Sequence, residues 1–237
     1  MSTISIRLHD VEATIRAAAE GAGRAPGSVR LLAVSKTFGA DAVLEAMQAG
    51  QRAFGENYLQ EALDKIAAVA QAAPGEAVEW HFIGPIQSNK TRPIASHFAW
   101  VHSVDRLKVA QRLSEQRPPE LGPLDICLQV NISGEESKSG VAQAELPALA
   151  RAVAALPNLR LRGLMAIPKP ERDPAKQRAP FAHMRDLLER LRVDGLDVDT
   201  LSMGMSGDLQ AAVAEGATIV RIGSAIFGAR HYDKGNA

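Results

Sequence analysis

The sequence predicts an α/β fold, a single parallel (β/α)8 TIM barrel preceded by one extra N-terminal helix. Short apolar runs of strand type recur eight times along the 237 residues, and Ala-, Leu- and Arg-rich stretches with helical spacing separate them. Strands that alternate with helices form a parallel sheet with helices outside it, and about 250 residues is the usual length of a closed eight-stranded barrel. A doubly wound open sheet is the structural alternative.

Eight segments have the composition of buried strands. They are residues 31–36, 52–55, 80–84, 99–103, 125–131, 161–167, 200–204 and 218–223. Helical spacing is clearest in the stretch that ends at Gly50, in residues 142–156 and in residues 181–193. Residues 5–20 predict the extra N-terminal helix. Its predicted buried stripe consists of Ile6, Val11, Ile15 and Ala18.

The polar, proline-rich segment 168–180 is predicted to be a surface loop at the end of the sixth strand, because the alternation of strands and helices resumes after it. No shift in composition marks a second domain. Residues 1–237 are therefore expected to form one barrel domain.

The composition argues against several classes of protein. Lys+Arg and Asp+Glu are equal at 27 each, so no overall field attracts nucleic acid or an anionic membrane. The single cysteine cannot form an intramolecular disulfide, which fits a reducing compartment, and no signal peptide or membrane span is evident. The six histidines lack the spacing of a metal site. We expect a cytoplasmic, monomeric protein without a bound metal.

Lys36 ends the first apolar run, and in a parallel barrel the carboxyl ends of the strands surround the active site. Alternate residues of a strand face the barrel interior, so Leu32, Val34 and Lys36 share one side. The same alternation turns Arg221 and Cys127 inward. Two cations as close as Lys36 and Arg221 would depress the pKa of the lysine and favour its attack on aldehydes. A solvated lysine at a strand end is the alternative.

The last two strands end in segments rich in serine and glycine, residues 202–208 and 221–228. Barrels often hold phosphate at the loops after these two strands, where glycines let backbone N–H groups approach an anion. Ser206 and Ser224 add hydroxyl donors. Ser206 is also a candidate N-cap for the following helix. Asp208 would repel phosphate, so we expect it to point away.

A lysine that reacts with aldehydes and a phosphate site at the same barrel mouth together predict pyridoxal 5'-phosphate (PLP) as the ligand. Arg221, which stays protonated, would face the pyridine nitrogen and keep that nitrogen unprotonated. Such a ring is a weaker electron sink than one paired with a carboxylate. A cofactor-free Schiff-base aldolase acting on a phosphorylated sugar is an alternative.

Four further segments carry a family resemblance. They are residues 33–37, 54–58, 81–90 and 163–167. Together with the two serine- and glycine-rich segments, they resemble the PLP homeostasis protein family, also called the YggS or proline synthase co-transcribed family, in order from about residue 5 to 230. That family is similar to the N-terminal barrel of alanine racemase, a fold-type III PLP enzyme.

The resemblance implies roles for individual residues. Lys36 would bear PLP and Arg221 would face the ring nitrogen. Ser206, Gly223 and Ser224 would bind the phosphate, with Ser224 standing where the family commonly has threonine. Three residues at strand ends would lie near the ring, although ordinary packing is an alternative for each. They are Asn57, Met165 and Met205.

The resemblance also bears on activity. Fold-type III racemases use a second base, a tyrosine from a separate C-terminal domain, and neither Tyr58 nor Tyr232 sits in such a domain here. No residue is therefore predicted to be catalytic. We expect a protein that carries or buffers PLP through a lysine aldimine, supports vitamin B6 and amino-acid homeostasis, and supplies apo PLP-dependent enzymes. A weakly active PLP-dependent amino-acid racemase is the alternative. Lys138, after the fifth strand, is hypothesised to take the aldehyde from Lys36.

Overall fold

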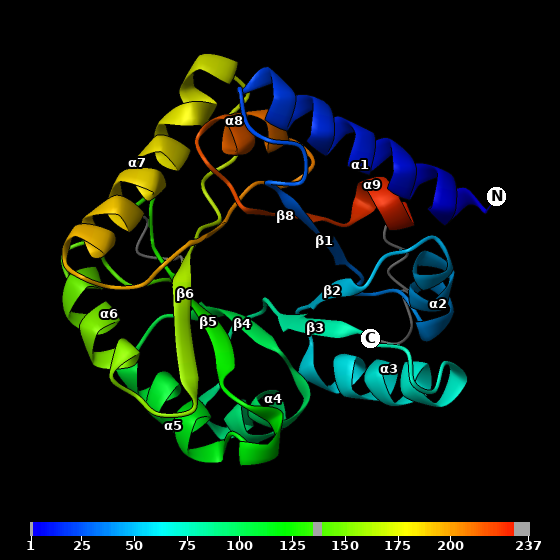
Figure 1. The fold of residues 1–237 in the computed structure, drawn as a ribbon, viewed down its shortest axis with the longest axis horizontal. Helices are drawn as coiled ribbons and strands as arrows, with labels where there is room; N and C mark the ends of the chain where they lie inside the picture. Colours follow the sequence, from blue (N-terminus) through cyan, green and yellow to red (C-terminus); the bar gives the residue numbers. More distant parts are fainter. Residues whose placement is uncertain (1, 135–138, 230–237) are drawn as a thin grey trace, which may run out of the picture.

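The computed structural model describes residues 2–134 and 139–229, and their strands form a closed parallel barrel ringed by helices (Figure 1). The strands follow one another in sequence order around the barrel. β8 closes it by pairing with β1, so that Arg221 lies opposite Leu32. The predicted (β/α)8 barrel is confirmed, and the open-sheet alternative is wrong.

Each strand falls in or beside a predicted segment. The strands are β1 (Arg30–Val34), β2 (Ala53–Glu56), β3 (Glu79–Phe82), β4 (Trp100–Val104), β5 (Leu124–Gln129), β6 (Leu159–Met165), β7 (Thr200–Ser202) and β8 (Ile219–Ile222). Several strands end one or two residues before the predicted limit. Lys36 therefore follows the end of β1 in a turn instead of lying within the strand.

Helices cover the outside of the barrel (Figure 1). They are α1 (Thr3–Gly21), α2 (Ala40–Gln48), α3 (Leu59–Ala72), α4 (Thr91–His97), α5 (Leu107–Gln116), α6 (Leu146–Ala154), α7 (Pro174–Val193), α8 (Leu209–Ala214) and α9 (Ser224–Phe227), with short 3-10 turns at Ser88–Lys90 and Pro119–Leu121. Within the described residues, no helix is long and apolar enough to cross a membrane.

The extra N-terminal helix is confirmed as α1, which lies against α8 and α9 (Figure 1). Its buried stripe differs in part from the prediction. Ile6 is 49% exposed, because it lies outside the stripe that faces the barrel, and Ala18 is half-buried. The buried residues of α1 are Leu8, Val11, Ile15 and Ala19.

The predicted loop 168–180 is wrong in its second half, because α7 begins at Pro174. Asp173 caps this helix by accepting a hydrogen bond from the Ala175 N–H (3.0 Å). Pro174 occupies the first helical position, where the missing N–H costs nothing. Pro180 lies inside the helix. Of the prolines that suggested a loop, Pro174 therefore marks a helix start.

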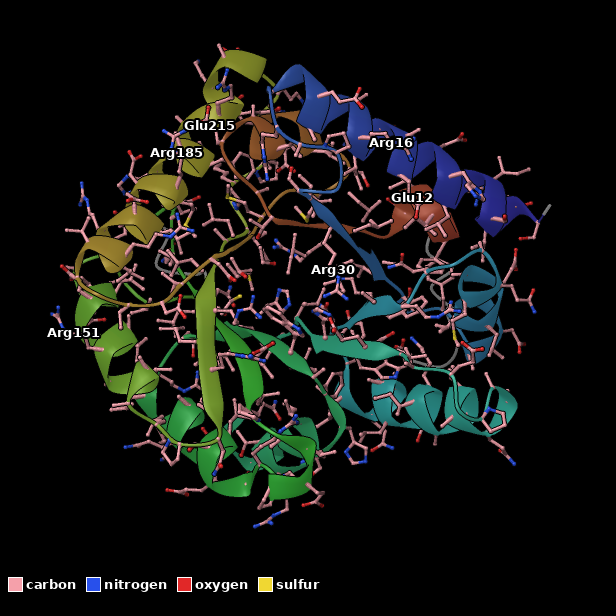
Figure 2. The ribbon with its side chains drawn as sticks, in the orientation of Figure 1. Glu12, Arg16, Arg30, Arg151, Arg185 and Glu215 are labelled. Carbon is pink, nitrogen blue, oxygen red and sulfur yellow. The ribbon has the colours of Figure 1, made fainter. Side chains whose placement is uncertain are left out.

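Ion pairs connect the first twelve residues of α7 to the residue that follows α8. Arg178 and Arg185 of α7 both pair with Glu215, which follows α8 and is 5% exposed. Figure 2 shows Arg185 and Glu215 next to each other.

Strand parity agrees with the prediction. A small apolar cluster fills the barrel interior and includes Leu32 and Cys127. Leu31, Ala33 and Ile126 belong instead to the larger core between the strands and the helices. The interior side of β1 and β8 therefore leads to the barrel mouth where Lys36 lies.

Candidate functional site

A cavity of about 230 Å³ opens at the carboxyl ends of the strands. Seven of the eight residues that the sequence predicts at or near the ligand line it, and Met165 does not. The lining consists of Val34, Lys36, Asn57, Ile83, Ile167, Met205, Ser206, Gly207, Arg221, Gly223 and Ser224. Segments separated by most of the chain thus meet at one place.

A tight turn presents Lys36 to this cavity. The Phe38 N–H donates to the Ser35 carbonyl (3.1 Å), so Lys36 and Thr37 form the middle of a four-residue turn. Thr37 has φ = +69°, a conformation that turns usually reserve for glycine or asparagine. Lys36 is half-buried. The turn holds it at the rim without extending β1.

Hydrogen-bond donors gather at the ends of β7 and β8. The hydroxyls of Ser206 and Ser224 are on exposed residues that line the cavity. In α9, the first N–H groups to bond within the helix belong to Ile226 and Phe227, which both donate to the Gly223 carbonyl (2.9 Å). The N–H groups before them lie at the helix start, outside its bonding pattern. This end of the cavity suits an anion.

Gly223 is required by close approach of the backbone. A Cβ at this position would lie 3.0 Å from the Val34 carbonyl oxygen of β1. Glycine therefore lets the start of α9 lie tightly against the strand that leads to Lys36.

Ser206 does not cap α8, contrary to the prediction. The N-cap is Asp208, whose carboxylate accepts from the Met205 N–H (2.6 Å). Burial raises the pKa of Asp208. Asp208 lines the neighbouring cavity beside Phe181, and not the one beside Lys36, which agrees with the expectation that it points away.

Arg221 lines the same cavity and is 5% exposed. Its Nη1 donates to the carbonyl (2.5 Å) and the hydroxyl (2.8 Å) of Ser202, and its Nη2 donates to the Ala166 carbonyl (2.9 Å). Burial lowers the pKa of Arg221 to about 10, so the guanidinium stays charged at neutral pH. A guanidinium has five N–H donors, and these bonds account for three.

The three residues predicted near the ring occupy different positions. Asn57 lines the cavity, and its buried Oδ1 has no hydrogen-bond partner within the described residues. Met205 is 37% exposed at the rim. Met165 is fully buried in the barrel interior and is not part of the lining, so it packs beneath the site.

These side chains fit PLP. Lys36 offers an amine for the aldehyde, and Ser206 and Ser224 offer donors for the phosphate. Arg221 offers a cation for the ring nitrogen, and the unpaired oxygen of Asn57 can accept a hydrogen bond from a ligand. Within the part of the chain that the structure describes, no group of three or more His, Cys, Asp or Glu residues could hold a metal ion.

A chain of buried hydrogen bonds extends from Arg221 through the barrel interior, and sequence reasoning missed it. The Ser202 hydroxyl, which contacts Arg221, lies 2.7 Å from Nδ1 of His102. Nε2 of His102 lies 2.8 Å from Nδ1 of His81. Nε2 of His81 lies 2.6 Å from Oε1 of Glu79, at the opposite end of the barrel. The chain therefore connects the site to the amino ends of the strands.

Glu79 fixes the direction of these hydrogen bonds. Burial alone would raise the pKa of Glu79, but the hydrogen bond from His81 and the charge of Arg30 lower it to about 2. Arg30 pairs with it at 2.7 Å and is labelled over the middle of the barrel in Figure 2. An ionised Glu79 only accepts, so neutral His81 donates from Nε2 and accepts at Nδ1. By the same reasoning, His102 donates from Nε2 and accepts from Ser202.

Both histidines are held neutral. Burial lowers the pKa of His81, although Glu79 partly offsets this. Burial together with the charge of Arg221 lowers the pKa of His102 well below its ordinary value. The unfolded chain binds protons at these positions below about pH 6.5, whereas the folded chain does not. Their contribution to stability is therefore present above pH 6.5 and is lost as the pH falls.

We predict a steep loss of folding stability between pH 7.5 and 5.5. Both histidines contribute to this loss, because the unfolded chain takes up protons at these positions as the pH falls through about 6.5, whereas burial lowers their pKa in the folded chain. Urea denaturation across this range measures the slope. His102→Gln should reduce it, whereas His9→Gln, at an exposed position on α1, should leave it unchanged. A wild-type stability that is flat across the range would contradict the neutral assignment.

Comparisons with known proteins agree with the predicted resemblance. The sequence matches the family described as alanine racemase, N-terminal domain, over residues 6–231. A pyridoxal phosphate homeostasis protein of Pseudomonas aeruginosa is 66% identical over 232 residues, which cover 98% of both chains. The pyridoxal phosphate homeostasis protein of Escherichia coli K12 is 53% identical and is covered completely (100%), along with 99% of this chain.

Solved structures of similar fold agree with these sequence matches. PipY of Synechococcus elongatus with PLP bound is similar with a TM-score of 0.83 at 38% identity, over 95% of this chain and 100% of PipY. Alanine racemase from Corynebacterium glutamicum has a TM-score of 0.70 at 16% identity, over 99% of this chain and 63% of that enzyme, and shows the shared fold.

Proposed function

The chain belongs to the pyridoxal phosphate homeostasis proteins, within the family of the alanine racemase N-terminal domain, and we propose that it binds PLP beside Lys36 and carries or buffers it. In this role it supports vitamin B6 and amino-acid homeostasis. The cofactor is PLP, which is also bound in PipY, a relative that this chain covers over its whole length.

One observation carries the proposal. A single cavity brings together a lysine, a buried arginine and two serines that come from both ends of the sequence. PLP supplies an aldehyde that a primary amine attacks, with loss of water, to form a reversible covalent link. We assign Lys36 as that amine.

The other side chains orient the ligand. Ser206, Ser224 and the backbone around Gly223 bind the phosphate, which fixes one end of the ring. Arg221 holds a positive charge at the ring nitrogen and cannot accept its proton. Asn57 and Met205 contact the ring from the rim. These residues would therefore bind PLP firmly but leave its ring a weak electron sink.

The proposal also covers the partners of the protein and its location in the cell. We propose that apo PLP-dependent enzymes receive the cofactor, and that the protein acts as a monomer in the cytoplasm. The half-exposed Lys36 supports handover, because a partner can reach it. Lys138, the second lysine hypothesised to take the aldehyde, lies outside the described residues.

Visible absorbance tests PLP binding. The purified protein loaded with PLP should show a visible absorption band from the lysine-linked aldehyde, and borohydride should bleach this band. A cofactor-free aldolase would show no such band. Isotope exchange at the α-carbon of alanine separates the carrier from a weak racemase, and rapid, Lys36-dependent exchange would contradict the carrier.

A further inference from the structure

A buried group of charged side chains lies behind the Lys36 turn, outside the cavity. It consists of Lys65 and Glu61 from α3 and Glu56 from β2. The side chains of Lys65 and Glu56 are 3% and 0% exposed, and that of Glu61 is 33% exposed. No role in PLP binding follows from direct contact, because none of the three lines the cavity.

Lys65 uses all three of its N–H donors in this group. Its Nζ donates to Oε1 of Glu56 (2.6 Å), to Oε1 of Glu61 (3.0 Å) and to the carbonyl of Ser35 (2.8 Å). An ammonium has no further hydrogens, so its bonding is saturated. One side chain thus joins two carboxylates to the backbone residue that precedes Lys36.

The two carboxylates hold the residues on either side of Lys36. Glu56 accepts a hydrogen bond from the Ser35 hydroxyl (2.6 Å). Glu61 accepts from the Thr37 N–H (2.6 Å). Residues 35 and 37 are therefore both anchored to the group that Lys65 organises, and Lys36 is the residue between them.

The anchoring explains an unusual backbone conformation. Thr37 is β-branched and has φ = +69°, which such residues adopt only where their surroundings enforce it. The hydroxyl of Thr37 is buried without a hydrogen-bond partner among the described residues. The N–H bond to Glu61 anchors Thr37 itself in this conformation.

We propose that Lys65, acting through Glu56 and Glu61, is the positioning residue that sets the Lys36 amine for attack on the PLP aldehyde. This inference rests on the function proposed above. In the step that it governs, unprotonated Nζ of Lys36 bonds to the aldehyde carbon, the oxygen leaves as water, and the reverse reaction consumes one water. Lys65 does not take part in forming or breaking these bonds. It affects only the position of the Lys36 side chain.

The test separates positioning from binding. Pyridoxine 5'-phosphate has the ring and phosphate of PLP but no aldehyde. Its Kd therefore measures non-covalent binding to the cavity, without the covalent link to Lys36. In Lys65→Met, we expect this Kd to stay within about twofold, while the rate at which the visible PLP band forms falls at least about tenfold. Lys65→Arg, which keeps the charge and the donors, should restore part of the rate.

Glu61→Ala provides a second variant at a half-exposed position, in case Lys65→Met does not fold. It removes the acceptor of the Thr37 N–H and should slow band formation in the same way. Asp64→Ala is the matched control, because it removes an exposed carboxylate from the same helix. It should change neither the rate nor the Kd.

Hydrogen exchange gives a readout that needs no ligand. The Thr37 amide should exchange slowly in the wild type and in Asp64→Ala, and faster in Lys65→Met and Glu61→Ala. Unchanged exchange and an unchanged rate of band formation would overturn the inference. If the wild type forms no PLP band at all, the proposed function fails instead, and the exchange pattern still decides whether Lys65 positions the turn.

Discussion

Replacing Lys36 with alanine is expected to remove the covalent PLP link at this position. Borohydride reduction of the PLP-loaded wild type should fix PLP on the peptide that contains Lys36, and the variant should carry no label there. The physical reason is that, among the described residues, Lys36 is the lysine that lines the cavity with Arg221 and the two serines. Peptide mapping by mass spectrometry measures the label.

The variant should keep its fold, because Lys36 is half-buried in a turn that the Phe38 N–H closes by donating to the Ser35 carbonyl. Label that remains in Lys36→Ala should map to Lys138 if the second-lysine hypothesis holds. Lys169→Ala, in an exposed segment after β6, is the control and should keep full label at Lys36. Wild-type label found only at other lysines would contradict the assignment of Lys36.

Removing both phosphate-end hydroxyls should weaken PLP binding strongly. A hydrogen bond to a charged group contributes about 1.5–3 kcal/mol, so each of Ser206→Ala and Ser224→Ala should raise the Kd about 10- to 100-fold. The double variant should raise it about 100- to 10,000-fold if the two contributions add. Equilibrium titration with PLP, followed by absorbance, measures these changes.

The same variants distinguish the contribution of the phosphate to binding from that of the ring. Pyridoxal, which lacks the phosphate, should bind the wild type and the double variant with similar Kd. Both serines are exposed, so folding should be preserved. Ser5→Ala on α1 is the control substitution and should not change the Kd. An unchanged Kd for PLP in the double variant would show that the phosphate lies elsewhere.

Local patterns in the sequence predicted most of the barrel. Period-two alternation put Leu32 and Arg221 on the interior side, and the structure pairs them across the closure between β1 and β8. The alternation works because each strand of a closed barrel has one face toward the interior and one toward the helices. Cys127, predicted to face inward, lies in the interior cluster for the same reason.

The sequence-based predictions that were wrong have identifiable physical causes. Prolines at 174 and 180 suggested a loop, but the first sits where a helix tolerates proline and Asp173 caps the start. Ser206 had the right residue type for a cap, yet Asp208 two residues later takes that position. Residue type identifies a candidate cap, whereas the backbone path decides which candidate lies at the helix end.

The polar networks behind the site could not be read from local patterns. The hydrogen bond between His102 and Ser202 joins residues 100 positions apart, and Lys65 reaches Ser35 across 30 positions. In the sequence, Lys65 is one charged residue in an amphipathic helix, which usually indicates a solvated side chain. Only the closed barrel shows that it is buried.

PLP transfer tests the proposed function most directly. The PLP-loaded protein is mixed with an apo PLP-dependent enzyme while a scavenger removes free PLP, and the activity gained by the recipient is followed in time. We predict that activation persists with the scavenger present, that its rate rises with the concentration of loaded protein, and that Lys36→Ala fails to support it. Activation that the scavenger abolishes, or that Lys36→Ala supports equally well, would contradict delivery of PLP from Lys36.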